Sequence, residues 1–161
     1  YYFRGFPEDH GERSRNVESR NLFNYVMRLT DHQLTPEDVY ITNLCNDDVE
    51  PAPKGKRTFI PEEKAQKGIE HIKWILSENP SIKCILAMSL QTNYWLQQLG
   101  FYEDGKAFTM ICGKAYDATD FPVKVFPVLP AKDYPLSDQN LDRYAKALDQ
   151  VVNYFRTNKI F

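Results

Sequence analysis

Residues 82–88 read Ile-Lys-Cys-Ile-Leu-Ala-Met, and Ser89 follows them directly. The run has strand length and is rich in residues that favour a strand buried on both faces. On its carboxyl side, residues 89–99 predict a helix that closes at a glycine. On its amino side, a helix is expected to begin near Pro61, because proline is tolerated at the first helical position, and to stop before Pro80. A buried strand between two helices is the unit from which α/β folds are built.

The same alternation extends to both ends of the chain. Residues 39–42 and 123–128 are further apolar runs of strand length, and a helix is expected from about residue 19 to residue 29. Ser137 can cap a last helix, whose apolar face has helical spacing and comprises Leu141, Tyr144, Ala145, Leu148, Val151, Val152 and Phe155. Strands separated by such helices normally pair in parallel, which predicts an α/β fold, a three-layer α/β/α sandwich with a central, mostly parallel sheet. Residues 108–120 are expected to add a hairpin or an edge strand.

Composition narrows the class of protein. The chain has 161 residues, 20 Lys plus Arg against 22 Asp plus Glu and a net charge of -2, so residues 1–161 are expected to form one domain that is not a strongly basic nucleic-acid wrapper. No apolar run approaches the roughly 18 residues of a membrane span, and the start shows no secretory segment. The three cysteines form no C-x-x-C pair, which predicts neither a zinc site nor a disulfide framework. We therefore expect a cytoplasmic protein with no metal, no cofactor and no membrane partner.

Ligands of open α/β sheets bind beyond the carboxyl ends of the strands, so the residues that follow the three apolar runs are candidates. These segments are residues 43–48, 89–92 and 129–134. They offer the Asn43 amide, the Ser89 hydroxyl beside a helix start that favours anions, and the polar side chains of residues 132–134.

Three short sequence features follow one another between residues 39 and 63. Residues 39–43 read Val-Tyr-Ile-Thr-Asn, a proline-containing loop with Lys56-Arg57-Thr58 follows, and Pro61-Glu62-Glu63 opens the next helix. This pattern resembles the uracil-DNA glycosylase superfamily, in particular its bacterial and archaeal branch. The likeness spans residues 11 to 152, and its most specific part is the Val-Tyr-Ile-Thr-Asn string. The resemblance implies a uracil-DNA glycosylase-like fold and a DNA repair hydrolase that binds DNA.

The resemblance implies a role for Asn43 in reading the edge of a flipped base, since a side-chain amide supplies both a donor and an acceptor. The alternative is that Asn43 only ends a strand or forms a turn. The aromatic residue that stacks on the base in the family falls near Arg15, so Tyr2 or Phe3 would have to supply the ring, unless both are packing residues. Ser89 completes the expected base-binding set.

The chain also departs from the family at decisive positions. Where the family has His-Pro-Ser after its last strand, this chain has Leu129-Pro130-Ala131, and leucine cannot donate a hydrogen bond to a departing base. The family's acidic residue after the first strand is not expected either, because the chain begins about where the following turn would be. Cys45 and Gly68 do not match the ligand positions of the iron-sulfur branch, so no iron-sulfur cluster is expected.

Substitutes for the missing chemical groups are few. Lys132 and Asp133 follow the last strand and are the candidate catalytic residues, although an exposed turn before Pro135 fits them better. A phosphate-binding role is expected for Lys54, Lys56 and Arg57, which share one loop, although an ordinary surface loop has similar charge. The acidic residues at 47, 48 and 50 fit a solvated loop better than a metal site.

Three interpretations remain open. In the first, the chain is a uracil-DNA glycosylase-like protein that binds a nucleobase or nucleic acid and removes uracil or a damaged base by N-glycosidic hydrolysis. In the second, it is a catalytically inactive α/β module that binds a small ligand or a protein at the same strand ends. In the third, it is a generic nucleotide-binding domain with an accidental Val-Tyr-Ile-Thr-Asn string.

Overall fold

The chain is described by a computed structural model that covers residues 13–45, 59–103 and 105–161. Its helices are α1 (Arg13–Leu29), α2 (Glu62–Glu78), α3 (Leu90–Gln98), α4 (Phe108–Ile111) and α5 (Asp138–Thr157). Its strands are β1 (Cys84–Met88), β2 (Tyr116–Asp117) and β3 (Lys124–Val128), and two 3-10 turns are η1 (Pro36–Asp38) and η2 (Ala131–Asp133). The described residues therefore form a mixed α/β structure, as the alternating pattern predicts.

The sheet of the described residues has three strands in the order β1-β3-β2. Strands β1 and β3 are parallel, with Cys84 opposite Lys124 and Met88 opposite Val128, whereas the short β2 is antiparallel to β3. The sheet is thus small and mixed. The prediction of a strand at residues 39–42 is wrong, because in the structure these residues belong to no strand.

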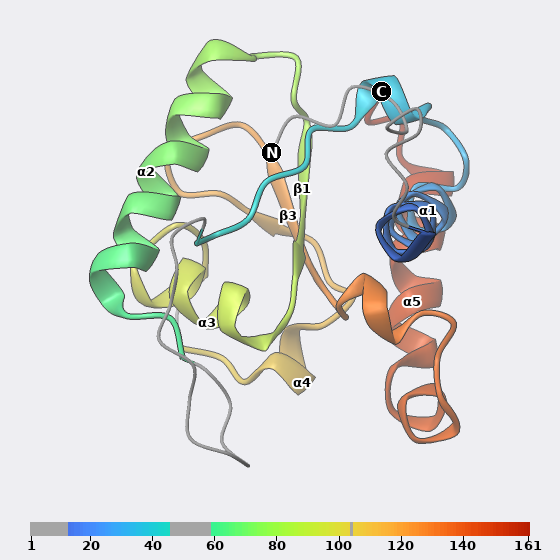
Figure 1. Cartoon of the computed structure of the whole chain (residues 1–161). Helices are drawn as coiled ribbons and strands as arrows, with labels where there is room; N and C mark the ends of the chain where they lie inside the picture. Colours follow the sequence, from blue (N-terminus) through green and yellow to red (C-terminus); the bar gives the residue numbers. More distant parts are fainter. Residues whose placement is uncertain (1–12, 46–58, 104) are drawn as a thin grey trace.

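Helices lie on both sides of β1 and β3 (Figure 1). On one side, α2 and α3 contribute Ile69, Leu76 and Leu96 to an apolar core that also contains Val125 of β3. On the other side, α1 and α5 bury a second core against the opposite face of the same strands. Its fully buried members are Tyr25, Leu29, Phe126, Val128, Val151 and Phe155. The alternating side chains of β3 thus serve two cores, which explains why this strand reads as a continuous apolar run.

The chain after η1 packs closely against α2 and forms no strand. An ideal Cβ atom on Gly68 would lie 1.7 Å from the carbonyl oxygen of Leu44, so the backbone of Leu44 passes directly over the missing side chain. The Leu44 side chain is buried with Ala65 and Ile69 of α2. Packing against a helix has therefore replaced strand pairing in this segment.

The ends of α1 and α5 are tied together although they are far apart in sequence. The Gln33 side-chain amide donates a hydrogen bond to the carbonyl oxygen of Phe155 at 2.6 Å. Arg156 donates to the carboxylate of Asp31 at 3.0 Å, and this hydrogen bond holds the pKa of Asp31 below its usual value. Ser137 caps α5 as expected, with its hydroxyl oxygen accepting from the Asn140 N–H. These contacts fix the helical layer that covers one side of the strands.

The segment expected to add a hairpin or an edge strand contains both a helix and a strand. Helix α4 comes first, and β2 then pairs at the edge of the sheet, which confirms the edge-strand alternative. Between them, Gly113 has φ +85°, and a Cβ atom there would lie 2.5 Å from the carbonyl oxygen of Ala147 in α5. The turn after α4 therefore needs glycine both for its backbone conformation and for close packing on α5.

Candidate functional site

The turn that joins β1 to α3 has a strained backbone at Ser89. Its φ of 96° and ψ of 158° fall in a region that is almost restricted to glycine, and such a conformation costs of the order of 1–3 kcal/mol. The Ser89 N–H donates to the carbonyl oxygen of Val128 at 3.2 Å, which joins the carboxyl end of β1 to that of β3. The Ser89 hydroxyl oxygen accepts from the Thr92 N–H at 3.3 Å and caps α3. Strain of this kind is concentrated at functional sites.

A buried side chain that the sequence reasoning missed braces this turn. Asn93 is 1% exposed, and its amide nitrogen donates to the carbonyl oxygens of Ala87 at 2.8 Å and Ser89 at 2.7 Å. Its amide oxygen accepts from the Tyr102 hydroxyl at 2.6 Å. Asn93 therefore holds the end of β1 and the start of α3 in a fixed relative position. The only sequence signal for it is a polar residue on the inner face of a short helix.

We expect that replacing Ser89 with glycine will raise the free energy of unfolding by about 1 kcal/mol. Glycine relieves the strained backbone at a cost of only a few tenths of a kcal/mol in capping. Ser137→Gly is the matched control, because Ser137 caps α5 with an ordinary φ of -66° and should lose stability slightly. Chemical denaturation of both variants measures the two effects. A Ser89→Gly variant less stable than its parent would show that the turn is not strained.

Asn43 lies on the exposed surface directly before the buried Leu44. Because the Leu44 carbonyl rests on Gly68, the position of Asn43 is set by α2 rather than by strand pairing. The chain re-enters the described structure at Phe59 and Ile60, and the Ile60 N–H donates to the Gln91 side-chain oxygen in the first turn of α3 at 2.8 Å. The described residues on either side of the gap therefore lie against α2, at Leu44, and beside the first turn of α3, at Ile60.

The candidate catalytic residues lie in η2, which follows β3. Lys132 is exposed and Asp133 is half-buried. Turn η2 packs toward α1, since Ala131 and Tyr134 belong to the α1–α5 core and the rings of Tyr25 and Tyr134 lie 5.3 Å apart. Ser89 and η2 thus share the carboxyl edge of the parallel pair. Asn43 is held by α2 on the other side of the strands, and no described contact joins it to η2.

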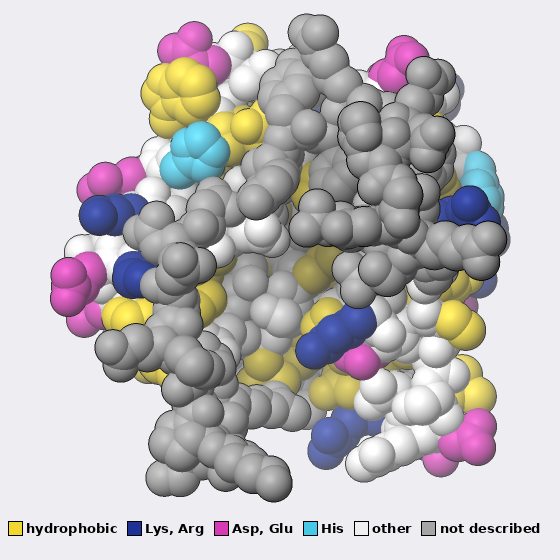
Figure 2. All heavy atoms as spheres, in the orientation of Figure 1, with side chains coloured by type: hydrophobic (Ala, Val, Ile, Leu, Met, Phe, Trp, Pro, Cys, Tyr) yellow, Lys and Arg dark blue, Asp and Glu magenta, His cyan; other side chains and the backbone are white. Residues whose placement is uncertain are grey.

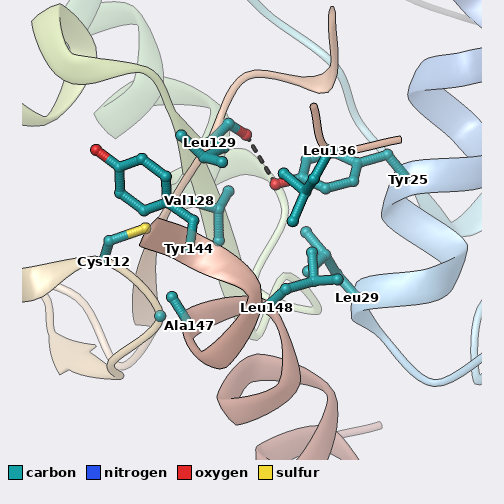
Figure 3. Close-up of a pocket in the computed structure, with 10 residues that line it drawn as sticks. Tyr25, Leu29, Cys112, Val128, Leu129, Leu136, Tyr144, Ala147 and Leu148 are labelled. Carbon is teal, nitrogen blue, oxygen red and sulfur yellow. Dashed lines mark hydrogen bonds between the residues drawn. The ribbon is translucent and has the colours of Figure 1, made fainter. Parts of the chain in front are cut away.

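The position at which the sequence resemblance would place a histidine, Leu129, is part of the core. Leu129 is 8% exposed and packs with Phe108, Cys112 and Tyr144, and its carbonyl oxygen accepts from the Tyr25 hydroxyl at 2.9 Å. Figure 3 shows the Tyr25 hydroxyl pointing to this carbonyl across a cavity between α1, α5 and the end of β3. The cavity has a volume of about 10 Å³, which is room for one water molecule at most. It is therefore a packing defect and not a substrate pocket.

Burial raises the pKa values of two thiols and one tyrosine hydroxyl in the core. Burial raises the pKa of the Cys112 thiol to about 12, and raises that of the Tyr25 hydroxyl. Burial likewise raises the pKa of the Cys84 thiol to about 12. These groups are therefore protonated at neutral pH, and the Tyr25 hydroxyl serves as a hydrogen-bond donor inside the core.

Several expected site residues fall outside the described residues. These are the base-stacking candidates Tyr2 and Phe3, the phosphate-binding candidates Lys54, Lys56 and Arg57, and the acidic group at 47, 48 and 50. On the face shown in Figure 2, the visible Lys and Arg side chains lie among acidic, apolar and uncharged ones rather than in one continuous basic surface. Among the residues that the structure covers, no group of three or more His, Cys, Asp or Glu side chains is placed to hold a metal ion.

Comparison of the chain with protein-family models, curated proteins and solved structures gives no match in any of the three. The site therefore has to be interpreted from its own geometry and from the sequence motif. Over the same described ranges, none of the helices is long and apolar enough to cross a membrane.

Proposed function

We propose that this protein binds a nucleobase, free or within nucleic acid, at the carboxyl ends of β1 and β3. The observation that carries the proposal is the strained Ser89 turn, where the ends of two parallel strands are joined by a hydrogen bond and braced by the buried Asn93. Ligands of α/β sheets bind at this edge, and a backbone strained by 1–3 kcal/mol persists only where the surroundings enforce it.

Asn43 supplies the base-reading group in this proposal. Its exposed amide offers one donor and one acceptor, which complement the amide edge of uracil. The Val-Tyr-Ile-Thr-Asn string that ends at Asn43 supports a uracil-DNA glycosylase-like identity and a three-layer α/β/α sandwich. In that arrangement, Lys54, Lys56 and Arg57 would contact phosphates, and affinity for DNA would fall with salt. A DNA repair role follows from the same identity.

Base removal makes further demands on the site. Hydrolysis of an N-glycosidic bond needs a donor at the departing base and a carboxylate or positioned water at the sugar. The Leu129 side chain cannot act as the donor, because it is apolar and buried. Hydrolysis would depend on Lys132 as the donor and Asp133 as the carboxylate, but both lie in η2, and no described contact joins η2 to Asn43. Base binding is therefore the primary proposal and base removal its extension.

The primary test is the binding of a labelled single strand that contains one uracil, measured by fluorescence anisotropy. Asn43→Ala is expected to weaken uracil-dependent binding about tenfold, because a bidentate base contact is worth about 1–3 kcal/mol. Asn24→Ala is the matched control, because it removes another exposed asparagine amide, on α1. Alkaline cleavage of the same strand after incubation detects base release.

Each outcome distinguishes the candidate functions. Uracil-dependent binding that Asn43→Ala removes supports the proposal, and strand cleavage that also requires Asp133 supports a glycosylase. Equal affinity for strands with and without uracil, in a folded protein, would contradict the proposal. That result would favour the alternative of an inactive module that binds a small ligand or a protein.

A further inference from the structure

The indole nitrogen of Trp95 is buried without a hydrogen-bond partner. Trp95 is 6% exposed, and its Nε1 atom is the one buried nitrogen or oxygen, among the side chains that the structure describes, for which no partner is present. Buried tryptophan N–H groups usually donate a hydrogen bond, because an unpaired donor has lost its bonds to water and gained nothing in return. An acceptor on a bound molecule is one way in which such a group is satisfied.

Two exposed rings pack on this indole. Phe59 is 56% exposed and Tyr94 is 47% exposed, and their ring centroids lie 5.6 Å and 5.0 Å from that of Trp95. Gln91 lies one helical turn before Trp95 on the same face of α3. Its side-chain oxygen accepts from the Ile60 N–H at 2.8 Å, which fixes the backbone next to Phe59. The exposed Phe59 side chain can therefore rotate away from the indole while its backbone stays in place.

We propose that the Trp95 N–H donates to a carbonyl oxygen of a nucleobase that displaces the Phe59 ring from the indole. The inference rests on the proposed base-binding function and names the group on α3 that the base contacts. An indole N–H is a donor only, so its ligand must offer an acceptor, and the aromatic rings around it favour a flat ligand. Uracil meets both requirements, since its carbonyl oxygens lie at the edge of a flat ring.

The position of Trp95 agrees with that of Asn43. Leu44, which directly follows Asn43, belongs to the same apolar core as Trp95, on the side of the strands where α2 and α3 lie (Figure 1). Side chains of a helix tilt toward its amino end, so the indole leans toward the Ser89 turn that precedes α3. The exposed amide of Asn43 and the unpaired donor of Trp95 therefore belong to one side of the sheet.

The described charges favour a neutral acceptor over an anionic one. Helix α3 contains no charged residue. The first charged residues after Phe59 are Glu62 and Glu63 in the first turn of α2, and both are exposed. Their carboxylates repel an anion, so a carboxylate or a phosphate is a poorer acceptor for Trp95 than the uncharged carbonyl oxygen of a base.

The test follows the indole N–H signals by nuclear magnetic resonance while uridine, a neutral nucleoside, is added and its binding is measured by calorimetry. The chain has two tryptophans, and Trp74→Phe assigns their signals. We expect the Trp95 signal to move to higher frequency as uridine binds, because a hydrogen bond deshields the donated proton. The signal of Trp74, which is 57% exposed on α2, should stay in place. A Trp95 signal that does not move at saturation, or a protein that binds no uridine, would overturn the proposal.

Two variants test the donor and the displaced ring. Trp95→Phe keeps an aromatic ring without the donor, and we expect it to weaken uridine binding about fivefold, the effect of one hydrogen bond, whereas Trp74→Phe should leave binding unchanged. Phe59→Ala should strengthen uridine binding, because no ring then has to be displaced. Circular dichroism checks that each variant is folded. Unchanged binding in folded Trp95→Phe, or weaker binding in Phe59→Ala, would contradict the proposal.

Failure of this inference is distinguishable from failure of the proposed function. If uracil-dependent binding of a DNA strand needs Asn43 but the Trp95 signal does not move, the proposed function stands without Trp95. If uridine moves the Trp95 signal equally in the parent protein and in Asn43→Ala, α3 holds a base site and the role of Asn43 is wrong. The absence of both responses would contradict both proposals.

Discussion

Replacing Gly68 with alanine is expected to lower the free energy of unfolding by about 3 kcal/mol, at the upper end of the usual cost of overpacking. The added methyl group would lie 1.7 Å from the carbonyl oxygen of Leu44, and a backbone atom cannot rotate away as a flexible side chain can. The segment that carries Asn43 must therefore move off α2. We expect uracil-dependent binding to fall together with stability.

Helix propensity alone predicts the opposite change in stability for Gly68→Ala, so the experiment distinguishes the two effects. In the interior of a helix, alanine is favoured over glycine by about 1 kcal/mol, so Gly68→Ala would stabilise α2 if Leu44 did not lie against it. Gly100→Ala is a useful control, because Gly100 has φ +75° and no atom within 4 Å of an added Cβ. That variant should lose about 1 kcal/mol from backbone strain alone. An increase in the melting temperature of Gly68→Ala would contradict the described contact.

Replacing Asn93 with alanine is expected to cost about 3 kcal/mol of stability, because it removes a fully buried polar network. The variant loses both hydrogen bonds donated to the backbone of the β1–α3 turn, and the hydroxyl of Tyr102 loses its acceptor inside the core. Since these bonds hold Ser89 in its strained conformation, ligand affinity should fall as well. Urea denaturation gives the first effect, and anisotropy at a temperature where the variant is folded gives the second.

Tyr102→Phe separates the two parts of this network. It removes only the hydroxyl that donates to Asn93 and leaves the two bonds to the turn intact, so we expect a loss of about 1 kcal/mol. Affinity should be nearly unchanged, because the Ser89 carbonyl is still held. Equal losses of affinity in Tyr102→Phe and Asn93→Ala would mean that the turn does not depend on the amide of Asn93.

The sequence predicts the existence of the four longer helices, because their signals are local, but it misses the short α4 and places the start of α1 near residue 19 instead of at Arg13. The Ser137 cap and the apolar face of α5 are both confirmed, as is the turn at Gly100 after α3. Strands β1 and β3 are also found where the apolar runs lie. The helical spacing of apolar residues also predicts that Leu141 is buried. This residue is 49% exposed, at the beginning of α5.

The features that sequence reasoning missed depend on contacts between distant segments. Residues 39–42 have strand composition, but whether a strand forms depends on a partner, and here Leu44 packs on Gly68 instead. The role of Asn93 depends on which way a short helix faces, which its weak amphipathic pattern does not reveal. Ser89 was expected from topology alone, whereas its strained backbone becomes visible only in three dimensions.

The pairing of α1 with α5 also has a consequence for how the protein is made. The hydrogen-bonded ends of this helical layer, Asp31 and Arg156, are 125 residues apart, so the ribosome must synthesise all the residues between them before they can meet. Until then, the apolar side chains of α1 have no helix to cover them. We therefore expect this half of the molecule to fold only after α5 has left the exit tunnel, and α1 to bind chaperones until then.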